Sequence, residues 1–299
     1  MEQLKPAVTV GMPVFNGERH VREAIESVLT QTRGDFELLI SDNSSTDRTA
    51  AICREYAARD RRIRFVEQDK NRGAYWNFQF VTEQAKGDFL VWLAHDDTLE
   101  ARYIEETVRH LNENYRVVIV CGDVRVIDDY GAQIDIETLV TIRDDIDWQQ
   151  RCSEFYKYPI SNALFSIYGM MRANICREVL RSVKPRRQMA QFELPILARF
   201  AAKGQISSLP IVLRTYRRHD ASLYNTEARA LWKESRVKRL IVGHAHIAKM
   251  RFGQIRVLLC SSMSSKFKIR VLLDVAKFYS CRLTQKIRRA SSGAGATFT

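Results

Sequence analysis

The chain has 299 residues, of which 45% are hydrophobic and 27% are charged, an ordinary globular composition. This length suffices for one large α/β domain, or for one domain with an appendage. The six cysteines stand singly with no C-x-x-C pair, which argues against zinc and redox dithiol sites and favours reduced, buried thiols. No stretch approaches the roughly 18 apolar residues of a membrane span, and the first residues lack the charged-then-apolar pattern of a signal peptide.

The net charge of +12 is concentrated in the last quarter of the chain. From Asn225 to the end there are 16 Lys and Arg against 3 Asp and Glu, a balance of +13. The first 224 residues carry 31 basic and 32 acidic side chains, so this part is close to neutral. A segment with this much positive charge indicates an anionic partner surface.

Strand and helix patterns alternate through the first half of the chain, with short turns between them. The predicted strands are residues 7–12, which Pro13 is expected to stop, and residues 36–41, 63–67, 88–94 and 117–126. The predicted helices are residues 18–32, capped by Asn16, then a helix from about Thr46, and residues 74–85 and 104–114. This alternation is typical of a mostly parallel sheet covered by helices.

The pattern loosens after residue 126. The sequence predicts a turn at residues 128–131, a surface loop or helix at 138–151, helices at 177–183 and 192–202, and a strand at 209–217. From about Thr226 the sequence is basic and predicts helices, and the final SSGAGATFT is expected to be disordered. No internal repeat or Gly/Ser linker divides the first 220 residues.

Three polar turns follow predicted strands: PVFNGE after the first, DNSSTD after the second and HDD after the fourth. In a doubly wound sheet, ligands bind beyond the carboxyl ends of the strands, so these turns are candidate site segments. The first turn lacks G-x-G-x-x-G, which argues against a dehydrogenase, and the chain has no G-x-x-x-x-G-K-[ST] loop. A phosphate site here would therefore need a metal.

Asp96 and Asp97 are the candidate metal ligands, because Mg²⁺ and Mn²⁺ prefer carboxylate oxygens together with substrate phosphates. A bound cation neutralises the charge that builds on a departing diphosphate. The alternative for the same residues is a helix cap or a solvated turn.

The blocks VTVGMPVFNGERHVREAIESVLTQT, FELLISDNSSTDRT, NRGAYWN and GDFLVWLAHDD occur in this order and spacing. Together they resemble the family 2 glycosyltransferases, over about residues 7–220, and most closely bacterial members with I-S-D-N-x-S-T-D and A-x-H-D-D. The resemblance implies a GT-A fold, a single nucleotide-binding α/β domain.

The resemblance also implies roles for individual residues. The turn after the first strand is expected to lie against the nucleotide, through Pro13, Phe15, Asn16 and Glu18. Asp42 matches the family aspartate that recognises the base or ribose, and Asn43 stands beside it. Asn71 and Gly73 match the N-x-G turn that lines the donor pocket.

Asp96 matches the second aspartate of the family's D-x-D metal motif, so the resemblance implies that it contacts the donor and the metal. Asp97 matches the acidic residue after the motif, and the resemblance implies metal and catalytic roles for it. The sequence departs from the family at the first position of D-x-D, which is Ala94. One donor or metal contact is therefore missing, which leaves open how strictly the enzyme depends on a divalent cation, Mg²⁺ or Mn²⁺.

An inverting transferase needs a carboxylate that removes the acceptor hydroxyl proton. The family usually places it eleven positions before a glycine that closes a helix; here that glycine is Gly204 and the acidic residue is Glu193. The alternative is a first-turn helix glutamate favoured by the macrodipole. His219 resembles a family position at which His completes the metal shell or touches the diphosphate, and the alternative is a packing or surface histidine. Arg217 and Arg218 could face phosphate or be solvated strand ends.

In the basic segment, apolar residues from Ile269 to Ile287 follow helical spacing and Lys and Arg occupy the other faces. Such a helix can lie at the interface of anionic lipids. The alternative is a helical pair that packs on the catalytic domain or on a second subunit. Nucleic acid is the least favoured partner, because few aromatic residues are available for base stacking.

The sequence therefore predicts a GT-A, Rossmann-like α/β domain over residues 1–224, with a nucleotide-sugar half at about 1–126 and an acceptor half at about 127–224. A basic helical extension over 225–290 and a tail over 291–299 follow. The predicted activity is inverting transfer of a sugar from a nucleoside diphosphate sugar to a saccharide or lipid-linked hydroxyl acceptor, in surface polysaccharide or lipid-linked glycan synthesis. We expect a cytoplasmic location, peripheral on the inner face of the plasma membrane.

Two alternatives remain at this point. A non-catalytic nucleotide- or glycan-binding protein with a degenerate transferase fold is supported by Ala94 and opposed by Asp96, Asp97 and Glu193. A nucleotidyltransferase would normally show a Gly- and Arg-rich loop after the first strand, and this loop is absent.

Overall fold

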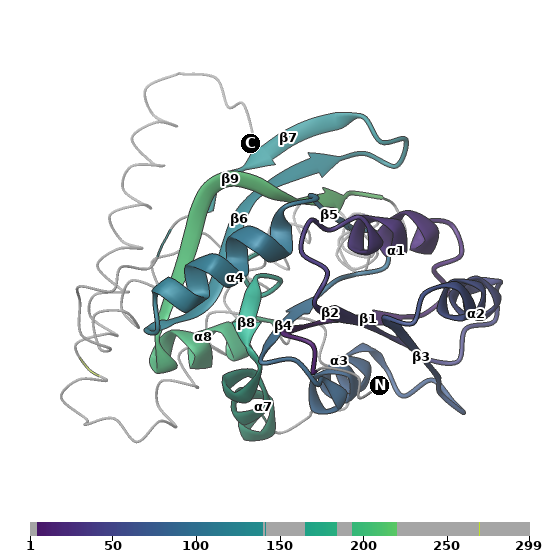
Figure 1. The fold of residues 1–299 in the computed structure, drawn as a ribbon, viewed down its shortest axis with the longest axis horizontal. Helices are drawn as coiled ribbons and strands as arrows, with labels where there is room; N and C mark the ends of the chain where they lie inside the picture. Colours follow the sequence, from purple (N-terminus) through teal and green to yellow (C-terminus); the bar gives the residue numbers. More distant parts are fainter. Residues whose placement is uncertain (1–4, 140, 142–164, 184–192, 220–268, 270–299) are drawn as a thin grey trace, which may run out of the picture.

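The computed structural model describes residues 5–139, 141, 165–183, 193–219 and 269, and the nine strands in this part form one sheet (Figure 1). The strands are β1 Val8–Val14, β2 Phe36–Asp42, β3 Ile63–Glu67, β4 Phe89–Trp92, β5 Thr98–Leu99, β6 Val117–Ile127, β7 Gln133–Glu137, β8 Met170–Arg172 and β9 Gln205–Arg217. The helices are α1 Val21–Leu29, α2 Thr49–Arg59, α3 Ala74–Gln84, α4 Tyr103–Glu113, α7 Ala173–Ser182 and α8 Glu193–Lys203. The strand order is β3-β2-β1-β4-β8-β6-β9-β5, and β7 pairs with β6.

The first four strands form the parallel half of the sheet. β1 pairs in parallel with β2 on one side and with β4 on the other, and β2 pairs with β3. Every residue of β2 and of β4 is buried, as expected for strands covered on both faces. The alternating strands and helices of the sequence therefore produce the predicted mostly parallel sheet.

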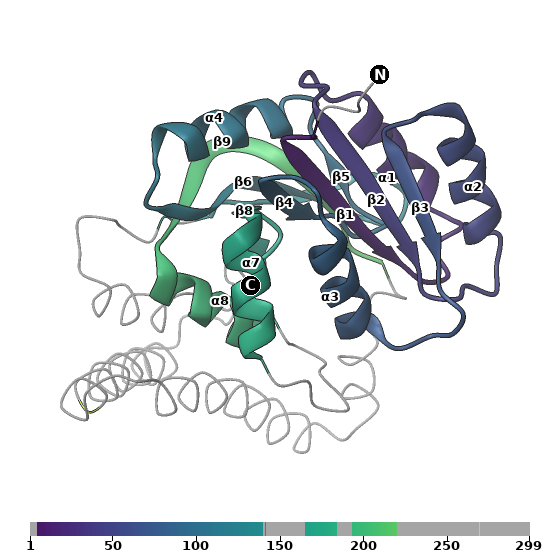
Figure 2. The same cartoon turned by 60° about the horizontal axis from the view of Figure 1, so that its bottom comes forward.

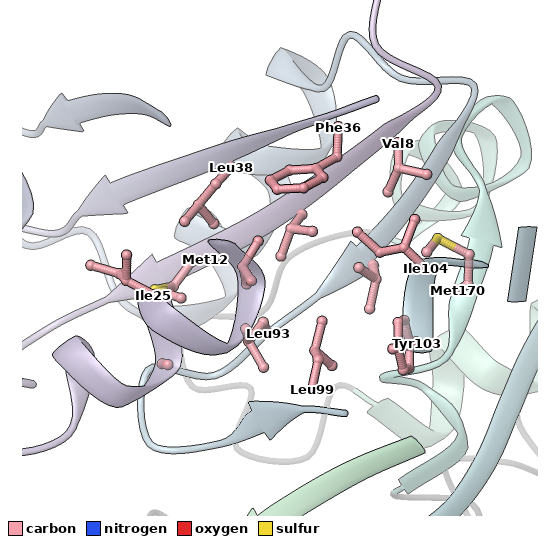
Figure 3. Close-up of a cluster of buried hydrophobic side chains, with 14 of the residues drawn as sticks. Val8, Met12, Ile25, Phe36, Leu38, Leu93, Leu99, Tyr103, Ile104 and Met170 are labelled. Atoms are coloured by element: carbon pink, nitrogen blue, oxygen red, sulfur yellow. The ribbon is translucent and has the colours of Figure 1, made fainter. Parts of the chain in front are cut away.

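Helices cover both faces of this sheet (Figure 2). α1, α2 and α4 pack on one face in a cluster that includes Val10, Met12 and Ile25. Figure 3 shows this cluster, in which α1 contributes residues at helical spacing: Val21, Ala24, Ile25 and Val28. α3, α7 and α8 pack on the other face, where Trp92 meets Phe78 edge-on with ring centroids 5.1 Å apart.

The second half of the sheet is mixed. The short strand β8 lies antiparallel between β4 and β6 and joins the two halves. β6 and β9 run side by side in parallel, with register shifts between them. β5 follows the turn after β4 and pairs with β9, so this turn lies against the end of β9.

The first strand passes through Pro13, contrary to the prediction that it stops there. β1 continues to Val14, and Pro13 is paired opposite Ser41 of β2. The ladder with β4 ends at Gly11, so Pro13 lies where β1 has a strand neighbour on one side only. A proline is tolerated at such an edge because its missing N–H removes no ladder hydrogen bond.

Asn16 is not the cap of α1, which corrects a second prediction. The cap position is His20, and no side chain caps the helix there. Asn16 instead has φ +51° and its Oδ1 accepts the backbone N–H of Thr46 at 2.9 Å. This left-handed backbone conformation is one that asparagine tolerates better than most residues.

Other differences concern the less periodic half of the chain. β5, β7 and β8 were not predicted, and α7 and β9 begin four residues before the predicted starts. The predicted turn at residues 128–131 is confirmed, with the Gly131 N–H donating to the Asp128 carbonyl at 3.2 Å. Most of residues 138–151 lie outside the described residues. The same holds for the predicted basic extension (225–290), of which only residue 269 is described, and for the tail (291–299). Where the structure describes the chain, no helix is both long enough and apolar enough to span a membrane.

Candidate active site

The carboxyl ends of β2, β1 and β4 lie side by side at one edge of the sheet. β1 pairs with β2 as far as Asp42 and with β4 as far as Trp92. The segments that follow the three strands, residues 15–18, 43–48 and 93–97, therefore meet at this edge. Open α/β sheets bind their ligands at such an edge.

The turn after β1 is hydrogen-bonded to the turn after β2 in both directions. Three consecutive backbone N–H groups donate to side chains: Asn16 to Ser45 Oγ (2.8 Å), Gly17 to Thr49 Oγ1 (2.8 Å) and Glu18 to Asp47 Oδ2 (3.1 Å). In return, the N–H groups of Thr46 and Arg48 donate to Asn16 Oδ1 (2.9 Å) and Glu18 Oε2 (3.0 Å). The two turns thus form one unit, held together by Asn16 and Glu18, which the sequence analysis assigned to donor binding.

On its other side the first turn packs against the segment after β4, where the His95 ring lies beside Gly17. Ala94 is the second residue of this segment, and its carbonyl accepts the Asp97 N–H at 3.2 Å. Phe15 is 42% exposed on the first turn, which leaves an aromatic face open at the site edge. The turn after β1 therefore lies between the strand ends that carry Asp42 and Asp96.

Asp42 ends β2 and is fully buried. Its Oδ2 accepts the Ser45 N–H at 3.1 Å, and its Oδ1 accepts the Ser45 hydroxyl. Burial raises the pKa of the Asp42 carboxyl above its usual value, although the two Ser45 hydrogen bonds act in the opposite direction. The carboxylate is thus held in one orientation at the edge.

Asn43 connects Asp42 to the turn before α3. Its Nδ2 donates to Asn71 Oδ1 at 3.0 Å, and its Oδ1 accepts the Arg72 N–H at 3.0 Å. Asn71 Oδ1 also accepts the Gly73 N–H at 2.8 Å, and Gly73 has φ +86°, a conformation that favours glycine. The four residues of this region that were predicted to bind the nucleotide sugar are therefore close together: Asp42, Asn43, Asn71 and Gly73.

Asp96 and His219 also meet, from the turn after β4 and the end of β9. Asp96 Oδ2 lies 2.7 Å from His219 Nε2, and the two side chains are only 15% and 12% exposed. Burial alone would raise the pKa of Asp96, but the His219 hydrogen bond and the neighbouring His95 keep it below its usual value. The same hydrogen bond raises the pKa of His219. Both pKa shifts favour an ionised Asp96 beside a protonated His219 when no cation is bound.

His20 and Asp129 extend this cluster, and neither was among the predicted site residues. The rings of His20 and His219 have centroids 5.8 Å apart, and His20 Nε2 lies 3.6 Å from Asp129 Oδ1. Asp129 also forms an ion pair of 2.7 Å with Arg19. The DDYG turn gave a local signal for residues 128–131, but only the fold brings that turn to the start of α1.

Asp97 points away from this cluster into the protein. It is 1% exposed, its Oδ1 accepts the Arg217 N–H at 3.0 Å, and its Oδ2 is paired with the Arg214 guanidinium. Both oxygens are therefore engaged by the protein itself. Direct metal binding and catalysis by Asp97 stay predictions, and this geometry favours a structural role.

Arg217 does not present its guanidinium to solvent. Its side chain is 5% exposed, its Nη2 donates to Glu23 Oε2 at 2.5 Å and its Nε donates to the Asp96 carbonyl at 3.3 Å. Arg218 is exposed, and its N–H donates to the Ile127 carbonyl at 2.8 Å. Of the two arginines, Arg218 alone is exposed for a phosphate contact.

A cation would need the substrate to complete its coordination here. Among residues 5–139 and the other described segments, no three His, Cys, Asp or Glu side chains are arranged to hold a metal ion. Asp96 and His219 offer one carboxylate and one imidazole nitrogen. Mg²⁺ and Mn²⁺ are often bound by one or two carboxylates together with substrate phosphates and water. The pair fits such a cation when diphosphate oxygens are present and the cation displaces the proton that His219 Nε2 shares with Asp96.

Glu193, the predicted acceptor base, is the first residue of α8, and its side chain lies outside the described part of the chain. An open pocket of about 470 Å³ lies elsewhere, between α1, β5 and the ends of β6 and β9, and its lining includes Glu23, Glu26, Glu100 and Arg125. None of the predicted donor residues lines it. The candidate site is therefore the strand edge, not this pocket.

The mostly parallel sheet, covered by helices and followed by acidic residues at the ends of β2 and β4, has the architecture of a GT-A domain. The family model for glycosyl transferase family 2 matches residues 9–180, so the chain belongs to this family. The predicted resemblance and fold class are thereby confirmed.

Curated relatives match the chain over part of their length. An uncharacterized glycosyltransferase of Rickettsia typhi is 33% identical over 39% of this chain, and EpsH of Bacillus subtilis, named as a glycosyltransferase, is 31% identical over 46%. The chain spans 36% and 40% of the lengths of these two relatives.

Solved structures share the fold at low sequence identity. TarS of S. aureus, residues 1–349 in complex with UDP-GlcNAc, has a TM-score of 0.64 and 14% identity, with 91% of this chain and 72% of that chain covered. The mannosyltransferase PcManGT from Pyrobaculum calidifontis, in complex with GDP-Man and Mn²⁺, has a TM-score of 0.52 and 15% identity, with 99% and 77% covered.

Proposed function

We propose that this chain is an inverting glycosyltransferase that moves a sugar from a nucleoside diphosphate sugar to a hydroxyl group of a saccharide or lipid-linked acceptor. The observation that carries the proposal is the position of Asp42 and Asp96 on either side of the turn that follows β1. Asp96 would serve the diphosphate, and Asp42, which is buried and bound through both oxygens to Ser45, would reach the nucleoside only after Ser45 gives up one of these hydrogen bonds. The nucleotide-sugar complexes of TarS and PcManGT support a donor of this class.

The nucleoside would lie along the unit formed by the turns after β1 and β2. Asp42 and Asn43 would contact the base or ribose, and Asn71 with Gly73 would close the pocket on the other side. Pro13 and the exposed Phe15 would supply apolar contact to the nucleotide. Because reciprocal hydrogen bonds fix these turns, little ordering would be needed when the donor binds.

The diphosphate would lie toward Asp96 and His219, which would hold Mg²⁺ or Mn²⁺ together with the substrate oxygens. When bound, the cation would offset the negative charge that develops on the leaving diphosphate. The Mn²⁺ complex of PcManGT supports cation use in a protein of this fold. Ala94 leaves Asp96 as the one aspartate of the D-x-D motif.

Glu193 would act as the base. In a single displacement, the acceptor oxygen forms the new bond to the anomeric carbon as the bond to the diphosphate oxygen breaks, and the acceptor proton passes to the Glu193 carboxylate. Attack from the face opposite the leaving group inverts the anomeric configuration. A surface polysaccharide or its lipid-linked precursor would be the acceptor, and the basic residues 225–290 would bring the enzyme to an anionic membrane.

Thermal unfolding with a panel of nucleoside diphosphates and their sugars, with and without Mn²⁺, tests this function. A ligand at about 100 times its dissociation constant adds about 2.7 kcal/mol of apparent stability, which is readily measured. We expect one nucleotide class to stabilise the protein and Mn²⁺ to increase that effect. Asp96→Ala should abolish the Mn²⁺ increment, whereas Asp88→Ala, at the opposite end of β4, should not.

A second candidate, a non-catalytic binding protein, is favoured by one observation, the alanine at position 94. It predicts nucleotide or glycan binding without transfer. Release of nucleoside diphosphate from the bound donor, and loss of this release in Glu193→Gln, would contradict it. No stabilisation by any member of the panel would contradict the transferase proposal.

A further inference from the structure

The turn that carries Asp96 is fastened to the end of β9 by strand pairing and by side-chain hydrogen bonds. β5 follows the turn and pairs with β9, with Leu99 opposite Arg214. The Asp97 carboxylate binds both Arg214 and the backbone N–H of Arg217. Arg217 then returns a side-chain hydrogen bond to the Asp96 carbonyl.

Arg217 is the residue on which these contacts converge. Its backbone N–H holds Asp97, its Nε holds the carbonyl of Asp96, and its Nη2 is anchored by Glu23 of α1. The side chain is 5% exposed, so the guanidinium stays enclosed between three elements. His219, the partner of Asp96, follows Arg217 by two residues on the same strand end.

This arrangement determines where the Asp96 carboxylate lies relative to His219. The Arg217 side chain holds the carbonyl of Asp96, while pairing of β9 with β6 places the strand end that carries His219, so the Arg217 side chain ties Asp96 to the strand end next to its partner. A guanidinium can serve two acceptors in fixed directions, which an ammonium cannot do in the same geometry.

We propose that Arg217 is a positioning residue of the transferase site, which holds Asp96 against His219 before any ligand binds. The inference deepens the proposed function and rests on it for the identity of the ligands. Arg217 would act through Asp96 and His219, not by touching the donor, in the manner of the outer residues that orient metal ligands.

The test compares Arg217→Lys with Arg125→Lys. Arg125 is a matched control because it pairs with Glu100 and Thr215, close to the same turn and strand, without contacting Asp96 or Asp97. Two readouts are needed: nitrogen–proton correlation spectra of the histidine rings in the unliganded protein, and calorimetric affinities for UDP and GDP with and without Mn²⁺.

For Arg217→Lys we expect the His219 ring resonances to shift, and the gain in nucleotide affinity produced by Mn²⁺ to fall by about 10-fold or more. Affinity without metal should match that of the wild type, and Arg125→Lys should change neither readout. Equal loss of affinity with and without Mn²⁺ would instead indicate that Arg217 contacts the diphosphate directly and would overturn the proposal. Unchanged His219 resonances would also overturn it.

Glu23→Ala keeps the proposal testable if Arg217→Lys does not fold. Glu23 is 56% exposed, so its truncation removes the outer anchor of Arg217 without opening the core. We expect smaller changes of the same sign in both readouts, and no change in either would contradict the inference. If the wild type binds neither UDP nor GDP, the proposed donor class is at fault, whereas the His219 spectra still decide the role of Arg217.

Discussion

Gly17 and His95 touch across the ends of β1 and β4: a Cβ on Gly17 would lie 2.4 Å from His95 Cδ2 and 2.8 Å from Cγ. No side chain can be added at position 17 while the ring keeps its place. The same glycine donates its N–H to Thr49 on the other side of the turn. The first turn of the candidate site is therefore enclosed between β2 and β4 with little freedom to move.

Gly17→Ala should consequently displace the His95 ring and lower the free energy of unfolding by about 1–3 kcal/mol, the usual effect of an added group in a packed site. His95→Ala removes the obstructing ring, so the double variant should be more stable than Gly17→Ala alone. Urea unfolding of the two single variants and the double variant measures the coupling between the two positions. Additive effects of the two substitutions would show that the clash with the His95 ring does not cause the loss of stability in Gly17→Ala.

Asp42→Asn should make the protein more stable at neutral pH and impair nucleotide binding. Burial raises the pKa of Asp42, so the folded state disfavours the ionised form, and this effect is present above the folded pKa. It disappears as the pH falls below the unfolded value of about 3.9. Unfolding curves over a pH series should therefore converge at low pH. A variant that is less stable than the wild type at neutral pH would refute this explanation.

Asn43→Ala should loosen the turn before α3, because it removes the partner of Asn71 and the acceptor of the Arg72 N–H. Asn43 is 2% exposed, and leaving buried polar groups unpaired costs about 1–3 kcal/mol each. Donor affinity should fall as well. Asn114→Ala, which removes a side-chain hydrogen bond at the end of α4, is the control for stability and should leave donor affinity unchanged.

Asp97→Ala should be among the most destabilising single changes, because it leaves Arg214 buried without its carboxylate. Two other nitrogens of Arg214, Nε and Nη1, already lack hydrogen-bond partners in the described structure. Removing one member of a buried ion pair costs about 3–5 kcal/mol, while replacing both members by apolar groups is often much less harmful. Asp97→Ala combined with Arg214→Met should therefore recover part of the loss in urea unfolding. No recovery would mean that the bond to the Arg217 N–H is the dominant contact.

The parallel half of the sheet could be predicted from the sequence because its signals are local. β2 and β4 are short apolar runs, α1 carries its apolar residues at helical spacing, and polar turns separate them. Their topology places the three turns at one edge, and the resemblance to the family then implied the roles of Asp42 and Asp96 at that edge. β8, three residues long, and β5, two residues long, give no comparable periodicity.

The side-chain partners could not be predicted in the same way, because they join residues far apart in the chain. Asp97 was predicted to bind metal because it follows Asp96 of the D-x-D motif. Its actual partner, Arg214, lies 117 residues away in the chain. His20 and Asp129 lie in segments that the sequence did single out, but nothing local pairs them, and they meet only because the turn after β6 reaches α1. Local pattern indicates which residues lie at strand ends, and tertiary packing decides which of them remain open to a ligand.

Amide chemical-shift mapping with the nucleoside diphosphate sugar that stabilises the protein most, in the presence of Mn²⁺, tests the central claim most directly. We predict that the affected amides cluster in the turns after β1, β2 and β4 and in the turn before α3, with Asn16, Asn43, Gly73 and Asp96 among them. Shifts confined to the pocket lined by Glu26, Glu100 and Arg125, or no shifts with any donor, would contradict the account.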